Sequence, residues 1–369
     1  MKILVTGAKG FVGKNLIVTL EQLEGVEIYS YDIDTVLALL DTYTKDCDFV
    51  FHLAGVNRPQ HEEEFQAGNF GFTSKLLNSL KLNHNTCPIL ITSSTQAALN
   101  NPYGRSKKEA EDLIFAYAKE AGAKIMVYRL PNVFGKWCRP NYNSAVATFC
   151  HTIAHDLPIK VNDPEVMMNL VYIDDVVEEM IRALHGNATR EGEFCKVPVV
   201  YTIKLGEIVE LIYYFKNSRN DLSVPDMADD FTKKLYATYL SYLPENQFSY
   251  PLKMNIDNRG SFTEIIRTPE RGQVSVNISK PGITKGNHWH HTKNEKFLVV
   301  SGQGVIRFRK VGSDEVIEYH VSGEKLVVVD IPTGYTHNIE NLGDTDMVTI
   351  MWANECFDPD KPDTYYLEV

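Results

Sequence analysis

The chain has 369 residues, and at roughly 100–200 residues per domain this length favours two domains. A hydrophobic fraction of 44% suits a globular protein, and a net charge of -11 argues against nucleic acid or an anionic membrane as a partner, since both require a basic surface. Scattered cysteines without a CxxC pair, no signal peptide and no bilayer-length apolar run predict a cytoplasmic protein with reduced thiols.

The first residues predict a phosphate-binding turn between a strand and a helix. Residues 2–6 (KILVT) form a short β-rich run, residues 14–23 (KNLIVTLEQL) have a helical pattern, and TGAKGFVG connects them. Glycines in such a turn let the backbone approach a pyrophosphate, and the helix N-terminus offers free N–H groups. A turn without a ligand is the alternative. The spacing therefore indicates a dinucleotide site.

A second predicted strand, 26–34, carries an acid suited to the adenosine ribose. Asp32 follows Gly13 by 19 residues, a position from which a carboxylate can hold the ribose hydroxyls, although a solvated turn residue would look the same. We expect the nicotinamide cofactor to be bound by the glycine turn, this acid and the end of the third strand, namely Gly7, Lys9, Gly10, Phe11, Val12, Gly13, Asp32, Leu53, Ala54 and Gly55.

Two further predicted strands complete the pattern of a parallel, doubly wound sheet. Residues 48–55 (DFVFHLAG) and 88–94 (PILITSS) alternate with helical segments, which is typical of this α/β architecture. Ligands bind at the carboxyl ends of such strands. Ser94 therefore lies where chemistry occurs.

A predicted helix over 102–120 adds a tyrosine and a lysine. Tyr103 and Lys107 are four residues apart and share a helix face, just after the strand that ends in Ser94. A phenol with a pKa of about 10 is a poor proton donor near neutrality, and a nearby ammonium group lowers that pKa. We expect Ser94 to hold a carbonyl oxygen, Tyr103 to deliver the proton and Lys107 to lower the pKa of Tyr103 while anchoring the nicotinamide ribose.

These segments resemble the extended, nucleotide-sugar-modifying branch of the short-chain dehydrogenase/reductase superfamily, with its Rossmann-like fold. The resemblance covers roughly the first 240 residues and implies the Ser-Tyr-Lys triad of that superfamily. The matching segments occur in the expected order: TGAKGFVG, HLAG, TSS, YGRSK, RLPNVFG (129–135) and NLVYIDDVV (169–177).

The residues around these motifs narrow the reaction. Sugar dehydratases of this branch carry an acid directly after the catalytic Ser or Thr, whereas Thr95 and Gln96 follow Ser94, so dehydration is disfavoured. The positive charge of Lys9 could bind the 2'-phosphate of NADPH, whereas the carboxylate of Asp32 would repel it. We expect NADPH because it suits a reductive biosynthetic step. The substrate, including its pyrophosphate, is expected to bind the segment that begins with PNVFG. The candidate residues are Asn132, Lys136 and Arg139. A solvated loop after PNVFG is an equal alternative.

The region around 215–252 reads as a closing helix and a linker, and after it the sequence changes to short alternating strands separated by turn signals. Such a texture predicts an all-β sandwich or small barrel. We expect a dinucleotide-binding domain over 1–245 and a separate β domain over 252–369. The predicted strands are 272–279, 295–302, 304–310, 315–321, 325–332 and 346–353.

The β region contains a set of metal-ligand residues. His288 and His290 lie two apart, so on a strand they face the same way, and Glu295 and His337 follow. Three imidazoles and a carboxylate suit Zn²⁺ or another first-row divalent ion. His291 points to the opposite face on this interpretation, where packing or solvation explains it.

Both segments resemble the two motifs of cupins, which are jelly-roll barrels. The first motif matches in full from Gly282 to Gly302. The second matches PTGYTHNIEN from Pro332 to Asn341, but its leading glycine, Gly323, is further away than the motif expects, which suggests a longer loop. A barrel mouth of this kind is a natural ligand cavity.

The order of the two regions resembles a family of bifunctional bacterial enzymes of capsular polysaccharide biosynthesis. The resemblance implies that the cupin epimerises carbon 3 of UDP-2-acetamido-2,6-dideoxy-4-hexulose. NADPH-dependent reduction at carbon 4 then gives the 6-deoxy-L-talose derivative, in the UDP-N-acetyl-L-fucosamine pathway. A homodimer is expected because both parent folds often pair. Lys296 and Tyr335 are the candidates for the base of the cupin.

Three other functions stay open at this stage. The first is a reductase whose cupin serves only for dimerisation, and the second is an NAD-dependent UDP-sugar 4-epimerase, which Asp32 permits. The third is a non-enzymatic sugar-nucleotide sensor, which would require Ser94, Tyr103 and Lys107 to be inert.

Overall fold

The computed structural model describes residues 1–59 and 61–369, which form two compact units. The N-terminal unit comprises Met1–Tyr213 and Ala228–Pro244, and the C-terminal unit comprises Tyr214–Met227 and Glu245–Val369. Helix α8 (Leu205–Asp221) therefore begins in the first unit and ends in the second. Within the described residues, no helix is both long and apolar enough to cross a bilayer.

A mainly parallel sheet lies at the centre of the N-terminal unit. Its strands are β1 (Lys2–Thr6), β2 (Glu27–Tyr31), β3 (Phe49–His52), β4 (Ile89–Ser94), β5 (Ile125–Leu130), β8 (Arg190–Glu191) and β9 (Phe194–Cys195). They follow the order β2-β1-β3-β4-β5-β9-β8, in which only β8 runs antiparallel to its neighbour. The order reverses between β1 and β3, and the carboxyl ends of strands at such a reversal form the usual ligand crevice.

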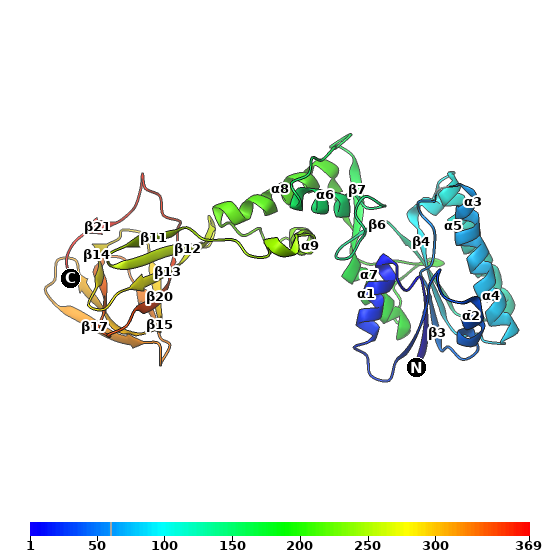
Figure 1. The fold of residues 1–369 in the computed structure, drawn as a ribbon, viewed down its shortest axis with the longest axis horizontal. Helices are drawn as coiled ribbons and strands as arrows, with labels where there is room; N and C mark the ends of the chain where they lie inside the picture. The colour runs from blue at the N-terminus through cyan, green and yellow to red at the C-terminus, as the bar shows by residue number, and fades with distance from the viewer. Residues whose placement is uncertain (60) are drawn as a thin grey trace. The chain divides into compact units, whose positions relative to one another are not determined.

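Helices cover both faces of this sheet (Figure 1). The helices of the unit, in chain order, are α1 (Phe11–Leu20), α2 (Leu37–Thr44), α3 (Glu63–Phe65), the π-helix η1 (Gln66–Gly71), α4 (Phe72–Leu82), the 3₁₀-helix η2 (Thr95–Ala98), α5 (Pro102–Ala121), α6 (Ala145–Ala154), α7 (Ile173–Leu184) and α9 (Asp230–Leu240). Side chains of α1 and α7 pack on one face, and those of α2, α4 and α5 pack on the other. The doubly wound architecture predicted from the sequence is thus confirmed.

The alternation of side chains along the strands explains the two cores. Ile3 and Val5 of β1 are fully buried against α1 and α7, whereas Leu4 between them is fully buried on the opposite face. Burying an aliphatic side chain of this size contributes roughly 1.5–3 kcal/mol. A strand buried on both faces must therefore be apolar throughout, which is why the run at residues 2–6 is readable as a central strand.

Local signals fix the start and end of α5. Asn101 caps the helix by accepting a hydrogen bond from the backbone N–H of Gly104 at 2.7 Å, and Pro102 occupies the first turn. Gly122 ends the helix in the left-handed conformation with φ of 71°. These signals place Tyr103 and Lys107 in the first two turns, directly after β4.

A smaller sheet, of order β10-β7-β6, completes the N-terminal unit beside α6 and α9. Its strands are β6 (Asn132–Phe134), β7 (Met167–Tyr172) and β10 (Tyr201–Lys204). Strand β6 runs parallel to β7 and is followed by a loop that leads to α6. Of the predicted substrate residues, Asn132 begins β6, and Lys136 and Arg139 lie in that loop.

Two antiparallel sheets form the C-terminal unit. One has the order β11-β12-β13-β20-β15-β18, with β11 (Met254–Asp257), β12 (Gly260–Thr268), β13 (Gly272–Ser279), β15 (Glu295–Ser301), β18 (Val328–Ile331) and β20 (Met347–Ala353). The other has the order β17-β16-β19-β14-β21, with β14 (Thr284–Trp289), β16 (Gln303–Lys310), β17 (Val316–Ser322), β19 (Tyr335–Asn341) and β21 (Tyr365–Tyr366).

The core of the C-terminal unit lies between these sheets. Phe297 and Val299 of β15 pack with Ile306 and Phe308 of β16. The predicted all-β architecture is confirmed, and every strand that the sequence predicted here has a counterpart in the structure. The two-sheet arrangement is consistent with a jelly roll.

Candidate functional site

The glycine turn lies where β1 and β3 diverge. Gly7 follows β1 with φ of 71°, and a Cβ at this position would lie 2.7 Å from the backbone nitrogen of Ala54, which follows β3. Only glycine allows this close approach of two backbones. Helix α1 begins at Phe11 and directs its N-terminus at the space beside the turn, as a pyrophosphate site requires.

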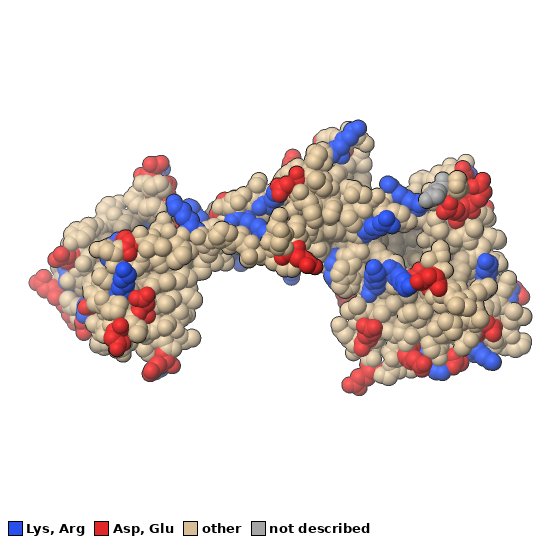
Figure 2. All heavy atoms as spheres, viewed as in Figure 1, with Lys and Arg blue, Asp and Glu red and all other residues tan. Residues whose placement is uncertain are grey.

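A cleft with a volume of about 540 Å³ runs from this turn across the ends of the strands. Figure 2 shows Lys and Arg side chains gathered around a hollow in the N-terminal unit, a charge pattern suited to an anionic ligand. Most of the predicted residues line the cleft: Gly7, Lys9, Gly10, Phe11, Val12, Gly13, Leu53, Gly55, Ser94, Tyr103, Lys107, Asn132 and Arg139. Three do not: Asp32, Ala54 and Lys136.

Asp32 and Lys9 are joined through the backbone of the turn. The carboxylate of Asp32 accepts hydrogen bonds from the backbone N–H of Lys9 at 2.7 Å and of Ile33 at 2.8 Å. The ammonium group of Lys9 pairs with the carboxylate of Asp34. Both partners of that ion pair are mostly exposed and screened by solvent, so the ammonium group of Lys9 can exchange Asp34 for another anion.

The structure places Ser94, Tyr103 and Lys107 at one end of the cleft. Ser94 is the last residue of β4, and its hydroxyl accepts a hydrogen bond from the backbone N–H of Gln96 at 3.1 Å. Lys107 donates a hydrogen bond to the carbonyl oxygen of Thr92 at 3.3 Å, and its Nζ lies 5.9 Å from the centre of the Tyr103 ring. The triad therefore faces the same space as the glycine turn.

The expected lowering of the pKa of Tyr103 is not found. Burial raises the pKa of Tyr103, and the hydroxyl of Ser94 opposes this rise only in part. The expectation was wrong for a physical reason: desolvation of the phenol outweighs the favourable contacts, and Lys107 is bound to Thr92 at some distance from the ring. In this structure the phenol is held protonated, as a proton donor must be.

A buried carboxylate behind the triad was not predicted from the sequence. Glu111 is fully buried and accepts hydrogen bonds from both Nε and Nη2 of Arg129, at 2.9 and 2.6 Å, and from the hydroxyl of Ser93 at 2.6 Å. Burial lowers the pKa of Lys107 to about 8, and the charge of Glu111 acts in the opposite direction. Glu111 thus helps to keep Lys107 an ammonium group. The sequence gives no sign of this role, because Glu111 lies in a helix of mixed polarity where a glutamate would be expected to face solvent.

The loop after β6 departs from the prediction at one residue. Lys136 forms an ion pair with Asp174 and does not line the cleft, whereas Arg139 lines it and lies over the ring of Tyr142 at 5.3 Å. Trp137 also lines the cleft and is half exposed, with φ of 67°. A non-glycine residue in this conformation stores backbone strain, which is common at ligand sites.

The four predicted ligand residues converge in the C-terminal unit. His288, His290, Glu295 and His337 each offer a ligand atom, and these atoms all lie within 4.8 Å of one another. Oε2 of Glu295 lies 3.5 Å from Nε2 of His290 and 3.3 Å from Nε2 of His337. His291 is exposed and packs beside Trp289, away from this cluster.

The cluster has the properties of a metal centre. Nε2 of His290, Oε2 of Glu295 and both ring nitrogens of His337 are buried without a hydrogen-bond partner among the described residues, an arrangement that is costly unless a cation satisfies them. Burial lowers the pKa of His288 to about 4, which keeps its imidazole neutral. Burial by itself would raise the pKa of Glu295, but the contacts with His290 and His337 lower it by more, so the net shift of this pKa is downward. Three imidazoles and a carboxylate fit Zn²⁺ or a similar ion.

Asp363 orients one of these histidines from a distant part of the sequence. Its backbone carbonyl oxygen lies 2.6 Å from Nδ1 of His290, which leaves Nε2 of His290 facing the cluster. Its carboxylate accepts hydrogen bonds from the backbone N–H groups of His291, Thr292 and Lys293 at 2.8–3.0 Å. Such outer contacts fix the tautomer and the ring orientation of a metal-binding histidine.

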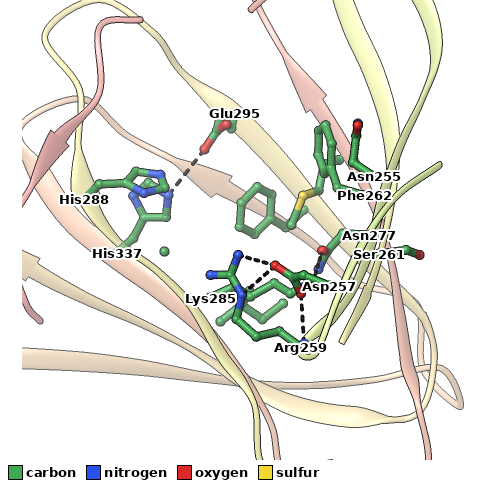
Figure 3. A pocket seen from close by; sticks show the side chains of 14 residues that line it. Asn255, Asp257, Arg259, Ser261, Phe262, Asn277, Lys285, His288, Glu295 and His337 are labelled. Atoms are coloured by element: carbon green, nitrogen blue, oxygen red, sulfur yellow. Dashed lines mark hydrogen bonds and ion pairs between the residues drawn. The ribbon is translucent and has the colours of Figure 1, made fainter. Parts of the chain in front are cut away.

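The cluster opens into a pocket with a volume of about 320 Å³. Figure 3 shows His288, Glu295 and His337 on one side of it, and Asp257 and Lys285 on the other. Apolar residues, among them Phe297, also line the pocket.

The predicted base candidates of the cupin do not line this pocket. Lys296 is exposed on the opposite face of β15 from Glu295 and pairs with Asp330, and Tyr335 packs against the core. For Lys296 the expectation failed because a strand alternates its side chains, so the residue next to a pocket-lining residue faces away. Tyr335 lies two residues from His337, and its packing against the core keeps it out of the pocket lining.

Comparisons with known proteins agree with this two-part architecture. The profile of the NAD dependent epimerase/dehydratase family matches residues 3–197, and that of the polysaccharide biosynthesis C-terminal domain matches residues 255–365. A UDP-2-acetamido-2,6-beta-L-arabino-hexul-4-ose reductase of Pseudomonas aeruginosa is 44% identical over 369 residues, which cover 100% of this chain and 99% of that protein.

Solved structures extend the similarity to the whole chain. The capsular polysaccharide assembling protein CapF of Staphylococcus aureus is 59% identical, with a TM-score of 0.96 and 100% of both chains covered. A UDP-glucuronic acid 4-epimerase of Bacillus cereus, solved with NAD, has 20% identity and a TM-score of 0.53 over 59% of this chain and 84% of that chain, a likeness of fold alone. The resemblance to bacterial enzymes of capsular polysaccharide biosynthesis is therefore confirmed, and the chain belongs to the NAD dependent epimerase/dehydratase family, among the members that carry a polysaccharide biosynthesis C-terminal domain.

Proposed function

We propose that this protein is a bifunctional nucleotide-sugar enzyme that epimerises carbon 3 of UDP-2-acetamido-2,6-dideoxy-4-hexulose and then reduces carbon 4 with NADPH. The product is UDP-2-acetamido-2,6-dideoxy-L-talose, a precursor of UDP-N-acetyl-L-fucosamine for capsular polysaccharide. Support for the substrate class comes from the full-length relatives, whose printed functions are a UDP-sugar reductase and a capsular polysaccharide assembling protein.

The N-terminal cleft carries out the reduction in this proposal. A nicotinamide cofactor held at the glycine turn and by Lys107 would supply the hydride for carbon 4. Ser94 holds the ketone oxygen by a hydrogen bond, and the buried phenol of Tyr103 transfers its proton to that oxygen as it gains charge. Lys107 then stabilises the phenolate, and Asn132 and Arg139 bind the substrate, Arg139 facing its anionic portion. Burial raises the pKa of Tyr103, so its phenol carries the proton to be transferred.

The C-terminal pocket carries out the epimerisation. A divalent cation held by His288, His290, Glu295 and His337, which we propose to be Zn²⁺, supplies Lewis-acid polarisation of the carbon-4 ketone. This polarisation acidifies the proton at carbon 3. The pocket has both apolar and polar walls, and its open side admits the nucleotide and water.

One observation carries the proposal. A single chain contains both a Ser-Tyr-Lys cleft beside a dinucleotide turn and a separate pocket in which four ligand residues converge within 4.8 Å. A reductase alone does not need the second pocket, and a sensor does not need the triad.

The test uses the UDP-linked 4-keto-6-deoxy-N-acetylhexosamine in deuterium oxide, with the sugar followed by NMR. Without NADPH, we expect deuterium to enter at carbon 3; adding NADPH should then consume cofactor and yield the reduced sugar. Tyr103→Phe should abolish NADPH oxidation and keep the exchange, whereas His290→Ala should lower metal content and abolish the exchange while leaving cofactor binding intact. NADPH-dependent reduction without any deuterium exchange would indicate that the cupin serves only for dimerisation. Tightly held NAD with no net NADPH consumption would indicate a 4-epimerase.

The preference for NADPH is part of the proposal. The exposed ammonium group of Lys9 lies at the rim of the cleft and can exchange Asp34 for the 2'-phosphate of the cofactor. The carboxylate of Asp32 would repel that phosphate, but this carboxylate is held against the turn by two backbone N–H groups. Relative KM values for NADPH and NADH test this preference.

A homodimer is also proposed. Strand β11 lies at the edge of its sheet and exposes Met254 by 52% and Ile256 by 70%. Apolar side chains on an open edge favour pairing with another chain. Light scattering should give twice the chain mass for the wild type, and Ile256→Lys should lower it; a monomeric wild type would refute the proposal.

A further inference from the structure

A bulge in β14 brings a lysine into the same pocket as the ligand cluster. Lys285 pairs with Ile339 of β19 and His288 pairs with His337, with a register shift between Gly286 and His288. Ile339 and His337 are two residues apart, so they face the same side of the sheet. Lys285 and His288 therefore also face that side, although they are three residues apart and would face opposite sides in a regular strand.

The backbone of the bulge adopts conformations that a regular strand does not. Asn287 is the extra residue and has φ of 58°, and Gly286 has φ of 109°. The side-chain oxygen of Asn287 accepts a hydrogen bond from Asn338 at 2.9 Å, which ties the bulge to the neighbouring strand. Bulges recur beside active sites because they redirect side chains.

The side-chain nitrogen of Lys285 is held in place by uncharged acceptors and not by a carboxylate. It donates hydrogen bonds to Oδ1 of Asn277 at 2.8 Å and to the carbonyl oxygen of Ile278 at 2.9 Å, both neutral acceptors. Asn277 is itself buried, with 2% of its surface exposed. Among the described residues, no carboxylate forms an ion pair with Lys285, so one N–H direction of its amine stays available to a ligand in the pocket.

The other titratable groups that line the pocket are already engaged. Asp257 of β11 is bound by Arg259 through a two-point ion pair at 2.6 and 2.9 Å. His288, Glu295 and His337 face Lys285 from β14, β15 and β19 and belong to the ligand cluster. Burial lowers the pKa of Lys285, Asp257 opposes this and Arg259 adds to it, and the net direction is downward.

We propose that Lys285 is the base that removes the proton from carbon 3 of the 4-keto sugar in the C-terminal pocket. The proposal rests on the epimerase half of the proposed function and names the residue that the sequence motifs leave out. It requires a substrate seated between Lys285 and the ligand cluster, the two sides of the pocket seen in Figure 3.

The proton and electron balance is complete with water as the only co-reactant. The neutral amine of Lys285 takes the proton from carbon 3, and the electrons of that C–H bond form a double bond between carbons 3 and 4 as the ketone becomes an enolate. Water in the open pocket then protonates carbon 3 on the other face, and the ammonium group of Lys285 returns its proton to solvent. Each inversion thus places one solvent hydrogen on carbon 3.

Two substitutions separate a base from a mere positive charge. Lys285→Arg keeps the charge but cannot lose its proton under these conditions, and Lys285→Ala removes both. We expect both variants to lower deuterium exchange at carbon 3 by about 10²-fold or more. Metal content, measured by mass spectrometry, and UDP binding, measured by calorimetry, should stay near wild type. Lys310→Ala, an exposed lysine at the end of β16, is the matched control.

Rescue by added amines gives a readout that a structural role would not produce. Exchange by Lys285→Ala should return with methylamine, ethylamine or 2-fluoroethylamine, and the rescued rate should follow the basicity of the amine. Wild-type exchange should rise with pH as Lys285 loses its proton, and both variants should lose this dependence.

The outcomes distinguish failure of this inference from failure of the proposed function. Exchange that persists in Lys285→Arg would overturn the role of Lys285 as the base while leaving the epimerase intact. Loss of exchange that amines do not rescue, together with loss of metal, would also overturn it. Absence of exchange in the metal-loaded wild type would refute the proposed epimerase itself.

Discussion

Replacing Gly286 with alanine should damage the ligand pocket far more than the same change at Gly282, four residues earlier. Both residues have a positive φ, 109° and 71°, so both variants incur a backbone strain of about 1–2 kcal/mol. A Cβ at Gly286 would also lie 2.7 Å from the backbone oxygen of His337 and 2.9 Å from Cα of Asn338, whereas no described atom lies within 4 Å at Gly282. Pushing β19 away adds about 1–3 kcal/mol.

These values give about 1–2 kcal/mol for Gly282→Ala and about 2–5 kcal/mol for Gly286→Ala. At about 4 °C per kcal/mol they correspond to losses of roughly 4–8 °C and 8–20 °C in Tm. The assay is thermal unfolding in a Trp137→Phe background, in which Trp289 and Trp352 are the remaining tryptophans and both report on the C-terminal unit. Gly286→Ala should also retain less metal because His337 is displaced. Equal losses of Tm in the two variants would refute the steric argument.

Three further predictions concern residues outside the bulge. Because burial lowers the pKa of Lys107 to about 8, and the triad needs an ammonium group, NADPH oxidation should fall above pH 8. Glu111→Gln removes the charge that raises this pKa, so the fall should begin at lower pH in kcat/KM profiles; an unchanged profile would contradict this. Asp363→Ala keeps the carbonyl oxygen beside His290 but removes the carboxylate that binds the backbone N–H groups of residues 291–293 and so holds that carbonyl in place. It should weaken metal binding by roughly 10–100-fold in chelator competition, and Asp360→Ala serves as the exposed control. Lys9→Ala should raise the KM for NADPH about tenfold but not that for NADH, and equal effects on both would exclude a contact with the 2'-phosphate.

Much of the fold could be predicted because its signals are local. The run KILVT, the glycine turn and the capped start of α5 at Asn101 and Pro102 each report on a few neighbouring residues. The grouping of residues 214–227 with the C-terminal unit has no such signal, since α8 continues through Tyr213 without a break. Unit membership depends on tertiary contacts, which the helical pattern does not encode.

The same distinction applies to the site. The spacing of His288, His290 and Glu295 is a local pattern, and the structure brings them together with His337. Lys285 could not be found in this way, because its separation of three residues from His288 indicates opposite faces unless the bulge is known. Asp363 lies 73 residues from His290 and acts through its backbone carbonyl, which any residue type possesses.

The segment from Asp363 to Val369 has a practical meaning for handling the protein. Besides the contact of Asp363 with His290, the backbone N–H groups of Leu367 and Val369 bind the backbone and side-chain oxygens of Asn287 at 2.9 and 3.4 Å. Thr336, beside His337, donates to the carbonyl oxygen of Leu367. Proteolytic loss of residues 363–369 would therefore remove these contacts from the metal-ligand strands. Preparations that differ only in these residues should differ in metal occupancy.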